Sequence, residues 1–200
     1  MGKKSGLLVV ISAPSGGGKT TVIQQLLNRG DPRFQYSVSA TTRPARANEK
    51  HGVHYLFISE EEFKKKIRAG EFIEWAIVHG NYYGTPREVV DQGLNAGKII
   101  LMDIDVQGGL EIKSKYQDDA LLIFVMPPSL KVLEQRLRAR RTEREEDIQK
   151  RLEVASKEIE KSKYYDVVVV NRELTETVDT IYQIIQNTYQ QRIGGVVNDA

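Results

Sequence analysis

The sequence of 200 residues contains no cysteine. A chain without thiols has no disulfide, no thiolate nucleophile and no sulfur ligand for zinc, so these kinds of site are excluded. The lack of disulfides fits an intracellular protein, and we expect a cytoplasmic one. Long hydrophobic runs are also lacking, since no apolar stretch approaches the roughly 20 residues that span a bilayer. The residues after Met1 do not resemble a secretory signal, and we expect no association with a membrane.

Neither sign of charge is in large excess. Lysine and arginine total 29 and aspartate and glutamate total 27, so the net charge is +2. That charge is too small to indicate a nucleic-acid partner by itself, and we expect none. The hydrophobic fraction of 40% and the charged fraction of 28% are typical of a globular domain. The length suffices for one core with small insertions. The composition leaves open whether the protein forms a homo-oligomer.

Four short apolar runs alternate with helical patterns along most of the chain. The runs cover residues 7–11, 99–102, 121–126 and 167–170. Apolar residues recur at helical spacing in residues 20–28, 86–95, 106–115, 129–140, 145–162 and 175–192. Buried strands that alternate with helices predict an α/β fold with a doubly wound parallel sheet. Residues 36–85 contain short alternating segments and a turn expected at GNYYG, which predict a small mixed or antiparallel insertion.

A glycine-rich segment, APSGGGKT, directly follows the first apolar run. It matches the pattern G-x-x-x-x-G-K-[ST] except that Ala13 stands at the first position. Glycines let consecutive N–H groups turn around a phosphate, and the following helix adds the positive end of its dipole. In such a loop Lys19 reaches the β- and γ-phosphates and Thr20 can bind Mg²⁺. The residues assigned to ATP here are Ala13, Pro14, Ser15, Gly16, Gly17, Gly18, Lys19, Thr20 and Thr21. The loop alone leaves GTPases, ATPases and small-molecule kinases open.

Two carboxylates follow the apolar run of residues 99–102. Asp103 and Asp105 stand at its carboxyl end, and ligands of parallel α/β sheets bind at the carboxyl ends of strands. Asp103 can hold Mg²⁺ through water, because this ion keeps much of its hydration shell. A solvated strand end is the alternative.

Two arginines of the insertion lie three residues apart around a proline. Arg43 and Arg46 can converge on one anion if the chain bends at Pro44, and Tyr55 and Tyr83 follow as phenol donors. Guanidinium forks and hydroxyls suit a phosphate, because they bind its oxygens with fixed geometry. Taken alone, the same residues can form an ordinary polar surface.

With these motifs in order, the sequence resembles the guanylate kinases of bacterial type, which transfer the γ-phosphoryl group of ATP to GMP. The resemblance covers nearly the whole chain, through SAPSGGGKTT, TTRPAR, HYLF, FIEWAIVHGNYYGT, LMDIDVQGG, RLRARRTE and VVVVN. It implies a three-layer P-loop core of residues 1–35, 86–136 and 148–200. It also implies a mixed α/β GMP-binding insertion at residues 36–85 and a helical lid at residues 137–147.

The resemblance further implies roles for single residues. The GMP phosphate would be held by Arg43, Arg46, Tyr55 and Tyr83, and the guanine surrounded by Ser39, Glu74, Thr85 and Asp105. Asn171 would lie near the adenine, and Mg²⁺ would bind with ATP at Thr20 and, through water, at Asp103. The residues implied in phosphoryl transfer are Lys19, Arg43, Arg136, Arg140 and Arg151. For Glu74, the solvated face of a strand is the alternative.

Competing functions make different demands on these residues. A sugar-phosphate kinase on the same scaffold would have no use for Glu74 and Thr85, and a non-catalytic interaction module would not need Lys19. A GTPase would carry an N-K-x-D-like motif, whereas Asn171 is followed by Arg-Glu. The arginine-rich residues 136–151 also fit a solvated helix or a nucleic-acid contact, although interleaved glutamates weaken the latter. We therefore predict a kinase for GMP.

Overall fold

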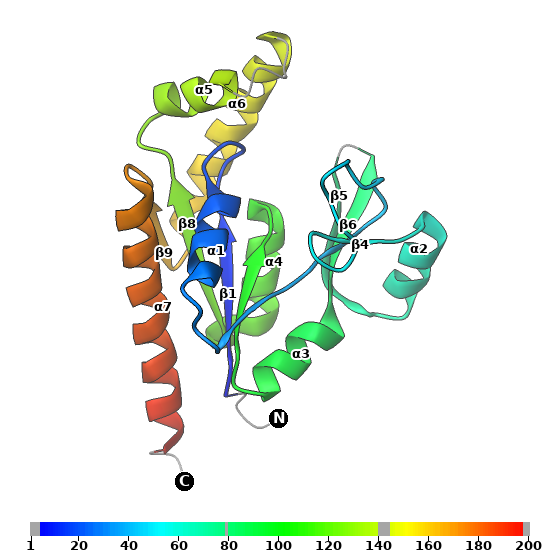
Figure 1. The fold of residues 1–200 in the computed structure, drawn as a ribbon, viewed down its shortest axis with the longest axis vertical. Helices are drawn as coiled ribbons and strands as arrows, with labels where there is room; N and C mark the ends of the chain where they lie inside the picture. The colour runs from blue at the N-terminus through cyan, green and yellow to red at the C-terminus, as the bar shows by residue number, and fades with distance from the viewer. Residues whose placement is uncertain (1–4, 79, 140–144, 198–200) are drawn as a thin grey trace.

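A five-stranded parallel sheet forms the centre of the computed structural model, which describes residues 5–78, 80–139 and 145–197 (Figure 1). The strand order is β2–β7–β1–β8–β9. The strands are β1 (Leu7–Ser12), β2 (Phe34–Tyr36), β7 (Ile99–Asp103), β8 (Ala120–Met126) and β9 (Val167–Val170). Because β1 is parallel to both β7 and β8, the loops that follow these strands leave the same edge of the sheet.

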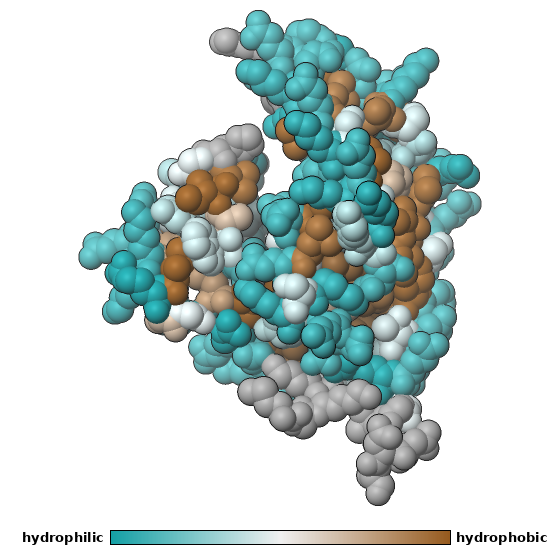
Figure 2. Space-filling view, turned by 180° about the vertical axis from the view of Figure 1, so that it is seen from behind, coloured by the Kyte–Doolittle hydropathy of each residue, from teal (hydrophilic) through white to brown (hydrophobic). Residues whose placement is uncertain are grey.

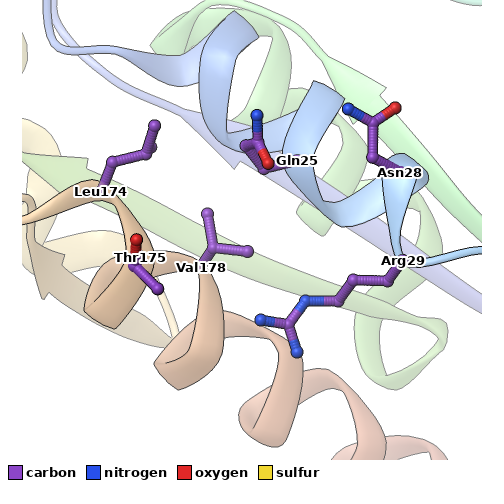
Figure 3. A pocket seen from close by; sticks show the side chains of 6 residues that line it. All are labelled: Gln25, Asn28, Arg29, Leu174, Thr175 and Val178. Carbon is purple, nitrogen blue, oxygen red and sulfur yellow. The ribbon is translucent and has the colours of Figure 1, made fainter.

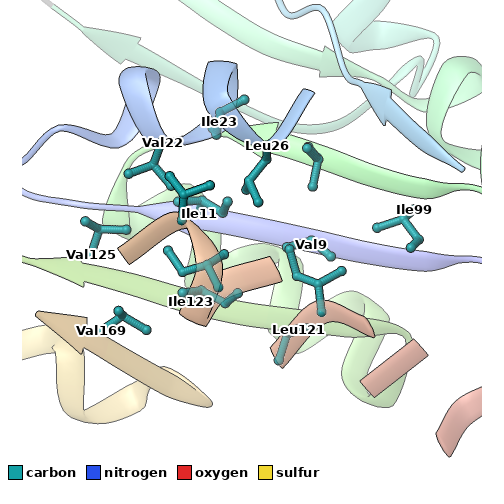
Figure 4. Packing of buried hydrophobic residues seen from close by; sticks show 14 of the residues in the cluster. Val9, Ile11, Val22, Ile23, Leu26, Ile99, Leu121, Ile123, Val125 and Val169 are labelled. Atoms are coloured by element: carbon teal, nitrogen blue, oxygen red, sulfur yellow. The ribbon is translucent and has the colours of Figure 1, made fainter. Parts of the chain in front are cut away.

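Helices cover both faces of this sheet. They are α1 (Lys19–Asn28) and α7 (Leu174–Val197) on one face, and α3 (Arg87–Asn95) and α4 (Val106–Tyr116) on the other. Side chains alternate along a strand, so Val9 packs toward α1 and α7 (Figure 4) while Val10 packs toward α3 and α4. Both are fully buried. The uninterrupted apolar run of β1 therefore follows from a strand covered on both faces.

A second, mixed sheet forms a smaller lobe with the order β4–β3–β6–β5. Its elements are β3 (Ala40–Thr41), β4 (Leu56–Phe57), α2 (Glu60–Arg68), β5 (Phe72–Val78) and β6 (Asn81–Pro86). Strand β3 runs parallel to β4, while β6 is antiparallel to both β3 and β5. Phe63 of α2 stacks on Phe72 with ring centroids 4.4 Å apart, which fixes the helix on the sheet.

Two helices follow β8 and pack on each other beyond the carboxyl edge of the parallel sheet (Figure 1). They are α5 (Leu130–Ala139) and α6 (Glu145–Glu160). Leu133 and Leu137 of α5 are buried with Ala155 of α6. The expected lid at residues 137–147 falls partly on residues 140–144, which lie outside the described residues. Two short 3₁₀ helices, η1 (Gln117–Asp119) and η2 (Lys161–Tyr164), complete the elements.

The structure confirms the α/β class, the parallel sheet and the mixed insertion, and it corrects two details. The expected turn at GNYYG is wrong, because Asn81–Pro86 is strand β6 and only Gly80 of that segment lies in a turn, with φ of 78°. The three-residue strand β2 was not expected. It joins the parallel sheet by pairing with β7.

The face of the molecule shown in Figure 2 is mostly hydrophilic. Trp75, Ile77 and Val78 of β5 are exposed apolar residues of the smaller lobe. Among the described residues no helix has both the length and the apolar character needed to cross a lipid bilayer. The outline is hollowed between the smaller lobe and the part that carries α5 and α6 (Figure 2).

Candidate functional site

The loop between β1 and α1 is tightly folded. The N–H of Gly17 donates to the carbonyl of Pro14 at 2.7 Å, and a Cβ at Gly17 would lie 2.9 Å from that of the buried Ala13. Gly18, which precedes α1, has φ of 97°, a left-handed conformation that glycine adopts without strain. Among the described residues no side chain caps α1. Its first N–H groups and the positive end of its dipole therefore suit an anion such as a phosphate.

Lys19 and Thr20 both contact the carboxylate at the end of β7. The Lys19 ammonium lies 2.7 Å from Asp103 Oδ1 and donates to the carbonyl of Ile104 at 3.0 Å. The Thr20 hydroxyl donates to Asp103 Oδ2 at 3.1 Å. One hydroxyl and one carboxylate, both hard oxygen donors, therefore lie together, and these residues fit Mg²⁺. Within the described residues no group of three or more acidic or histidine side chains could hold a metal. An ion at this point would thus rely on water and phosphate oxygens.

Asn171, after β9, lies against the loop and is only 5% exposed. Its Nδ2 donates to the carbonyl of Gly17 at 3.1 Å and would lie 2.7 Å from a Cβ at Gly18. Thr177 donates to its Oδ1 at 3.3 Å, and Arg136 donates to its main-chain carbonyl at 3.1 Å. In this structure Asn171 therefore supports the phosphate-binding loop, and its contact with adenine stays a prediction.

Arg43 is the centre of a cluster in the smaller lobe. Its Nε donates to the hydroxyl of Tyr83 at 3.2 Å, and its guanidinium lies 5.6 Å from the ring centroid of Tyr55. Its Nη2 donates to Glu49 Oε1 at 2.8 Å, while the N–H of Arg46 donates to Glu49 Oε2 at 2.8 Å. The hydrogen bond from Arg43 lowers the pKa of Glu49 to about 2. Tyr55 and Tyr83 thus contact Arg43, and Arg43 shares the carboxylate of Glu49 with the main chain of Arg46.

Glu74 of β5 is a buried acid, only 6% exposed. The hydroxyl of Thr85 donates to Glu74 Oε1 at 2.6 Å. Oε2 would lie 3.3 Å from a Cβ at Gly108, so Glu74 is next to the amino end of α4, where Asp105 Oδ1 accepts the Gly108 N–H at 2.7 Å. Burial raises the pKa of Glu74 to about 7, against the lowering effect of the hydrogen bond from Thr85. The interpretation of Glu74 as a solvated residue is therefore wrong.

The remaining predicted residues lie around these groups. Ser39 is half-buried just before β3, and Thr21 is exposed on α1. Arg151 of α6 donates to the hydroxyl of Ser15 at 3.4 Å, which links the lid helices to the loop. Arg140 lies outside the described residues.

Comparisons with known proteins show the family of this chain. A family model described as guanylate kinase matches residues 5–188. The chain belongs to the guanylate kinase family. It is 47% identical over 185 residues to a guanylate kinase of Desulfitobacterium hafniense, with 92% of each chain covered. It is 46% identical over 182 residues to one of Thermotoga maritima, covering 91% of this chain and 87% of that one. The crystal structure of guanylate kinase from Anaplasma phagocytophilum matches with a TM-score of 0.76 and 37% identity, covering 94% of this chain and 88% of that one.

Two acidic residues at this guanylate kinase site were missed by the sequence analysis. Glu49 follows Arg46 by three residues, and this spacing could have indicated that it binds the N–H at the start of the turn. Glu158 lies on α6, and its Oε2 is a buried oxygen with no hydrogen-bond partner among the described residues. It is one of several glutamates on α6, so nothing in the sequence distinguishes it.

A pocket of about 410 Å³ lies apart from the candidate site, between α1 and α7 (Figure 3). It is lined by Gln25, Asn28, Arg29, Leu174, Thr175 and Val178. None of the residues predicted for the guanylate kinase reaction lines it. The exposed His51 and His54 each accept a main-chain hydrogen bond in the smaller lobe, and His79 lies outside the described residues.

Proposed function

We propose that this chain transfers the γ-phosphoryl group of ATP to GMP, giving ADP and GDP, with Mg²⁺ as the cofactor. The observation that carries the proposal is the end of β7. There Asp103 contacts the phosphate-binding loop through Lys19, and two residues later Asp105 caps α4 beside Glu74. One short segment thus joins a triphosphate site on the parallel sheet to a second site on the smaller lobe.

The base selectivity follows from the buried carboxyl of Glu74. Guanine presents two adjacent donors, N1–H and the N2 amino group, and a carboxylate accepts both. Adenine has an acceptor at N1 and no 2-amino group, so AMP would leave Glu74 without donors. A site built to pair with donors rejects an analogue that lacks them by roughly 10⁴. Thr85 donates to Glu74 in this structure, which holds the carboxylate in place.

The phosphate of GMP needs no general base. Its second pKa is about 6, so at neutral pH the attacking oxygen is already mostly deprotonated. That oxygen forms a bond to the γ-phosphorus, and the bond from phosphorus to the β,γ-bridging oxygen breaks, which leaves ADP. The barrier is therefore mainly the approach of two polyanions in line.

Cations from both lobes reduce this repulsion. Lys19 would bind the ATP phosphates from the loop, and Arg43 with Arg46 would hold the GMP phosphate once it replaces the carboxylate of Glu49. Thr20 and Asp103 would hold Mg²⁺, which supplies charge neutralisation of the phosphate oxygens when bound. Arg151 already contacts Ser15 of the loop, and Arg136 contacts Asn171, which lies against the loop. Both arginines would add positive charge as the lobes approach, and this approach would also exclude water.

The test is the release of ADP in a coupled assay against a panel of nucleoside monophosphates. We expect turnover with GMP and little with AMP, CMP or UMP. Lys19→Ala should retain its circular dichroism and lose kcat by about 10²-fold or more, because the charge acts where phosphoryl charge develops. Lys131→Ala, an exposed lysine of α5, is the matched control and should keep its activity. Full activity of Lys19→Ala, or no preference for GMP, would contradict the proposal.

A further inference from the structure

Glu158 is a half-buried acid beside the phosphate-binding loop, and the proposed reaction does not use it. It lies on α6, which passes behind the loop between β1 and α1 (Figure 1). From the same helix Arg151 contacts Ser15. Glu158 Oε2 is buried and has no hydrogen-bond partner among the described residues. An unpaired buried carboxylate oxygen is costly, and one in a native structure calls for an explanation.

The surroundings of Glu158 oppose its ionisation when the loop holds an anion. Burial is the largest influence on its pKa and raises it, while the Ser15 N–H and the charge of Lys19 lower it. The charged and titratable groups that face it are Lys19 of α1, Asp105 before α4, Lys161 of η2 and Tyr165. Nucleotide phosphates would engage Ser15 and Lys19, the two groups that now favour the ionised carboxylate, and would add negative charge of their own.

We propose that Glu158 is a proton-linked positioning residue of the phosphate-binding loop, whose carboxylate takes up one proton from solvent when nucleotide phosphates bind at Ser15 and Lys19. The proposal rests on the proposed function in that it requires a nucleotide in this loop. The neutral acid no longer repels the phosphates. Glu158 can then stay against the loop and keep α6 in contact with it.

The sign of the pH dependence follows from linkage. If binding takes up protons, the affinity for the nucleotide falls as pH rises. Uptake of one full proton corresponds to a rise in Kd of about tenfold per pH unit, which is the upper limit. Glu158→Gln imitates the neutral acid, so its Kd should change less with pH than that of the wild type.

The experiment is calorimetric titration of the full chain with ADP and Mg²⁺ at pH 8, where the ADP phosphates are already ionised. Enthalpies measured in two buffers of different ionisation enthalpy give the number of protons taken up. We expect the wild type to take up more protons than Glu158→Gln, with one proton as the upper limit of the difference. Glu153→Gln removes an exposed charge from the same helix and should match the wild type.

Equal proton uptake in wild type and Glu158→Gln would overturn the proposal. Infrared difference spectra of the wild type give a second reading that does not depend on a folded variant, since ADP should produce the carbonyl band of a protonated carboxylic acid. ADP binding with no proton uptake and no such band would overturn the role of Glu158 and leave the proposed function intact. No binding of ADP to the wild type would overturn both.

Discussion

At the scale of single residues, Glu74 shows a conflict between stability and recognition. Its carboxyl is buried and has one neutral donor, Thr85. Burial disfavours the charged form and outweighs the hydrogen bond from Thr85 and the charge of Lys115, which is why its pKa rises to about 7. Guanine requires the ionised form, because only the carboxylate accepts two hydrogen bonds. The donors of the base therefore add the hydrogen bonds that Thr85 alone does not supply.

The first prediction concerns base selectivity. Glu74→Gln keeps the volume of the side chain but offers only one acceptor oxygen, so one donor of guanine faces an amide N–H. We expect kcat/KM for GMP to fall by about 10²-fold or more, while the low activity with AMP stays or rises. Both values are measured in the coupled assay, with the exposed Glu61→Gln as the control. A variant that discriminates as well as the wild type would show that Glu74 does not read the base.

The second prediction concerns stability in the absence of substrates. The pKa of Glu74 is raised from 4.5 to about 7 in the folded state. Its contribution to the free energy of unfolding is therefore fully present below pH 4.5 and is lost as pH rises through 7. At 1.36 kcal/mol per pKa unit, the loss amounts to about 3 kcal/mol. Glu74→Gln does not titrate. Its free energy of unfolding from urea titrations should therefore exceed that of the wild type at pH 8 and match it near pH 4.5. An equal difference at both pH values would contradict this account.

Residues within one motif were predictable from the local pattern, whereas some of the residues that meet across the fold were not. The loop from Ala13 to Thr20 is contiguous, and its residue types are dictated by the turn and the phosphate. Glu158 reaches the same loop from α6, more than 130 positions away in the sequence. Asn171 was expected at the adenine, yet its side chain binds the carbonyl of Gly17. Such contacts depend on how helices pack, and local patterns do not encode that.

At the scale of elements, apolar periodicity predicted the strands and helices of the parallel sheet to within a few residues, because each buries a continuous face. It failed where burial is partial. Strand β2 has only three half-buried residues, so no apolar run marks it. The segment GNYYG has the composition of a turn, but Tyr82 and Tyr83 pair with β5, and tertiary contacts outweigh local propensity there.

The third prediction tests the junction between the loop and α1. Gly18→Ala introduces left-handed strain of about 1–2 kcal/mol and a contact of 2.7 Å with Asn171 Nδ2. Gly30→Ala has a similar φ, 70°, but nothing within 4 Å, so it carries the strain alone. We expect Gly18→Ala to unfold at lower urea concentration than Gly30→Ala and to lose affinity for ADP by calorimetry, whereas Gly30→Ala keeps it. Equal effects would mean that Asn171 does not hold the loop.

The fourth prediction compares two arginines of the lid helices. Arg151 contacts Ser15 of the loop, while Arg138 bridges Glu134 of α5 and Glu145 of α6. If Arg151 acts on the phosphates as they react, Arg151→Ala should lower kcat more than it raises the Kd of ADP. Arg138→Ala should change kcat little, because exposed ion pairs contribute at most about 1 kcal/mol. A loss confined to binding would make Arg151 a docking residue.

At the scale of the whole molecule, the candidate site is divided between two sheets. The parallel sheet holds the phosphate-binding loop, and the mixed sheet holds the cluster around Arg43 and the carboxyl of Glu74. The hollow between the lobes lies open to solvent (Figure 2). Reaction requires the two phosphates to meet, so the lobes must approach while each keeps its own ligand. The division also means that a substitution can weaken the binding of one substrate without affecting the binding of the other.

The last prediction uses that division. Arg43→Lys keeps the positive charge but loses the planar fork that now binds both Tyr83 and Glu49. The loss of a bidentate, charge-assisted contact should raise the Kd of GMP by about tenfold or more. The Kd of ADP, bound at Lys19 on the other sheet, should stay within about twofold. Arg33→Lys is the control and should leave both constants unchanged, because Arg33 pairs with Asp31 and donates to Gln186 of α7, and neither is a predicted site residue. Calorimetry with each ligand alone measures both values, and a parallel loss for GMP and ADP would show that Arg43 supports the fold rather than one substrate.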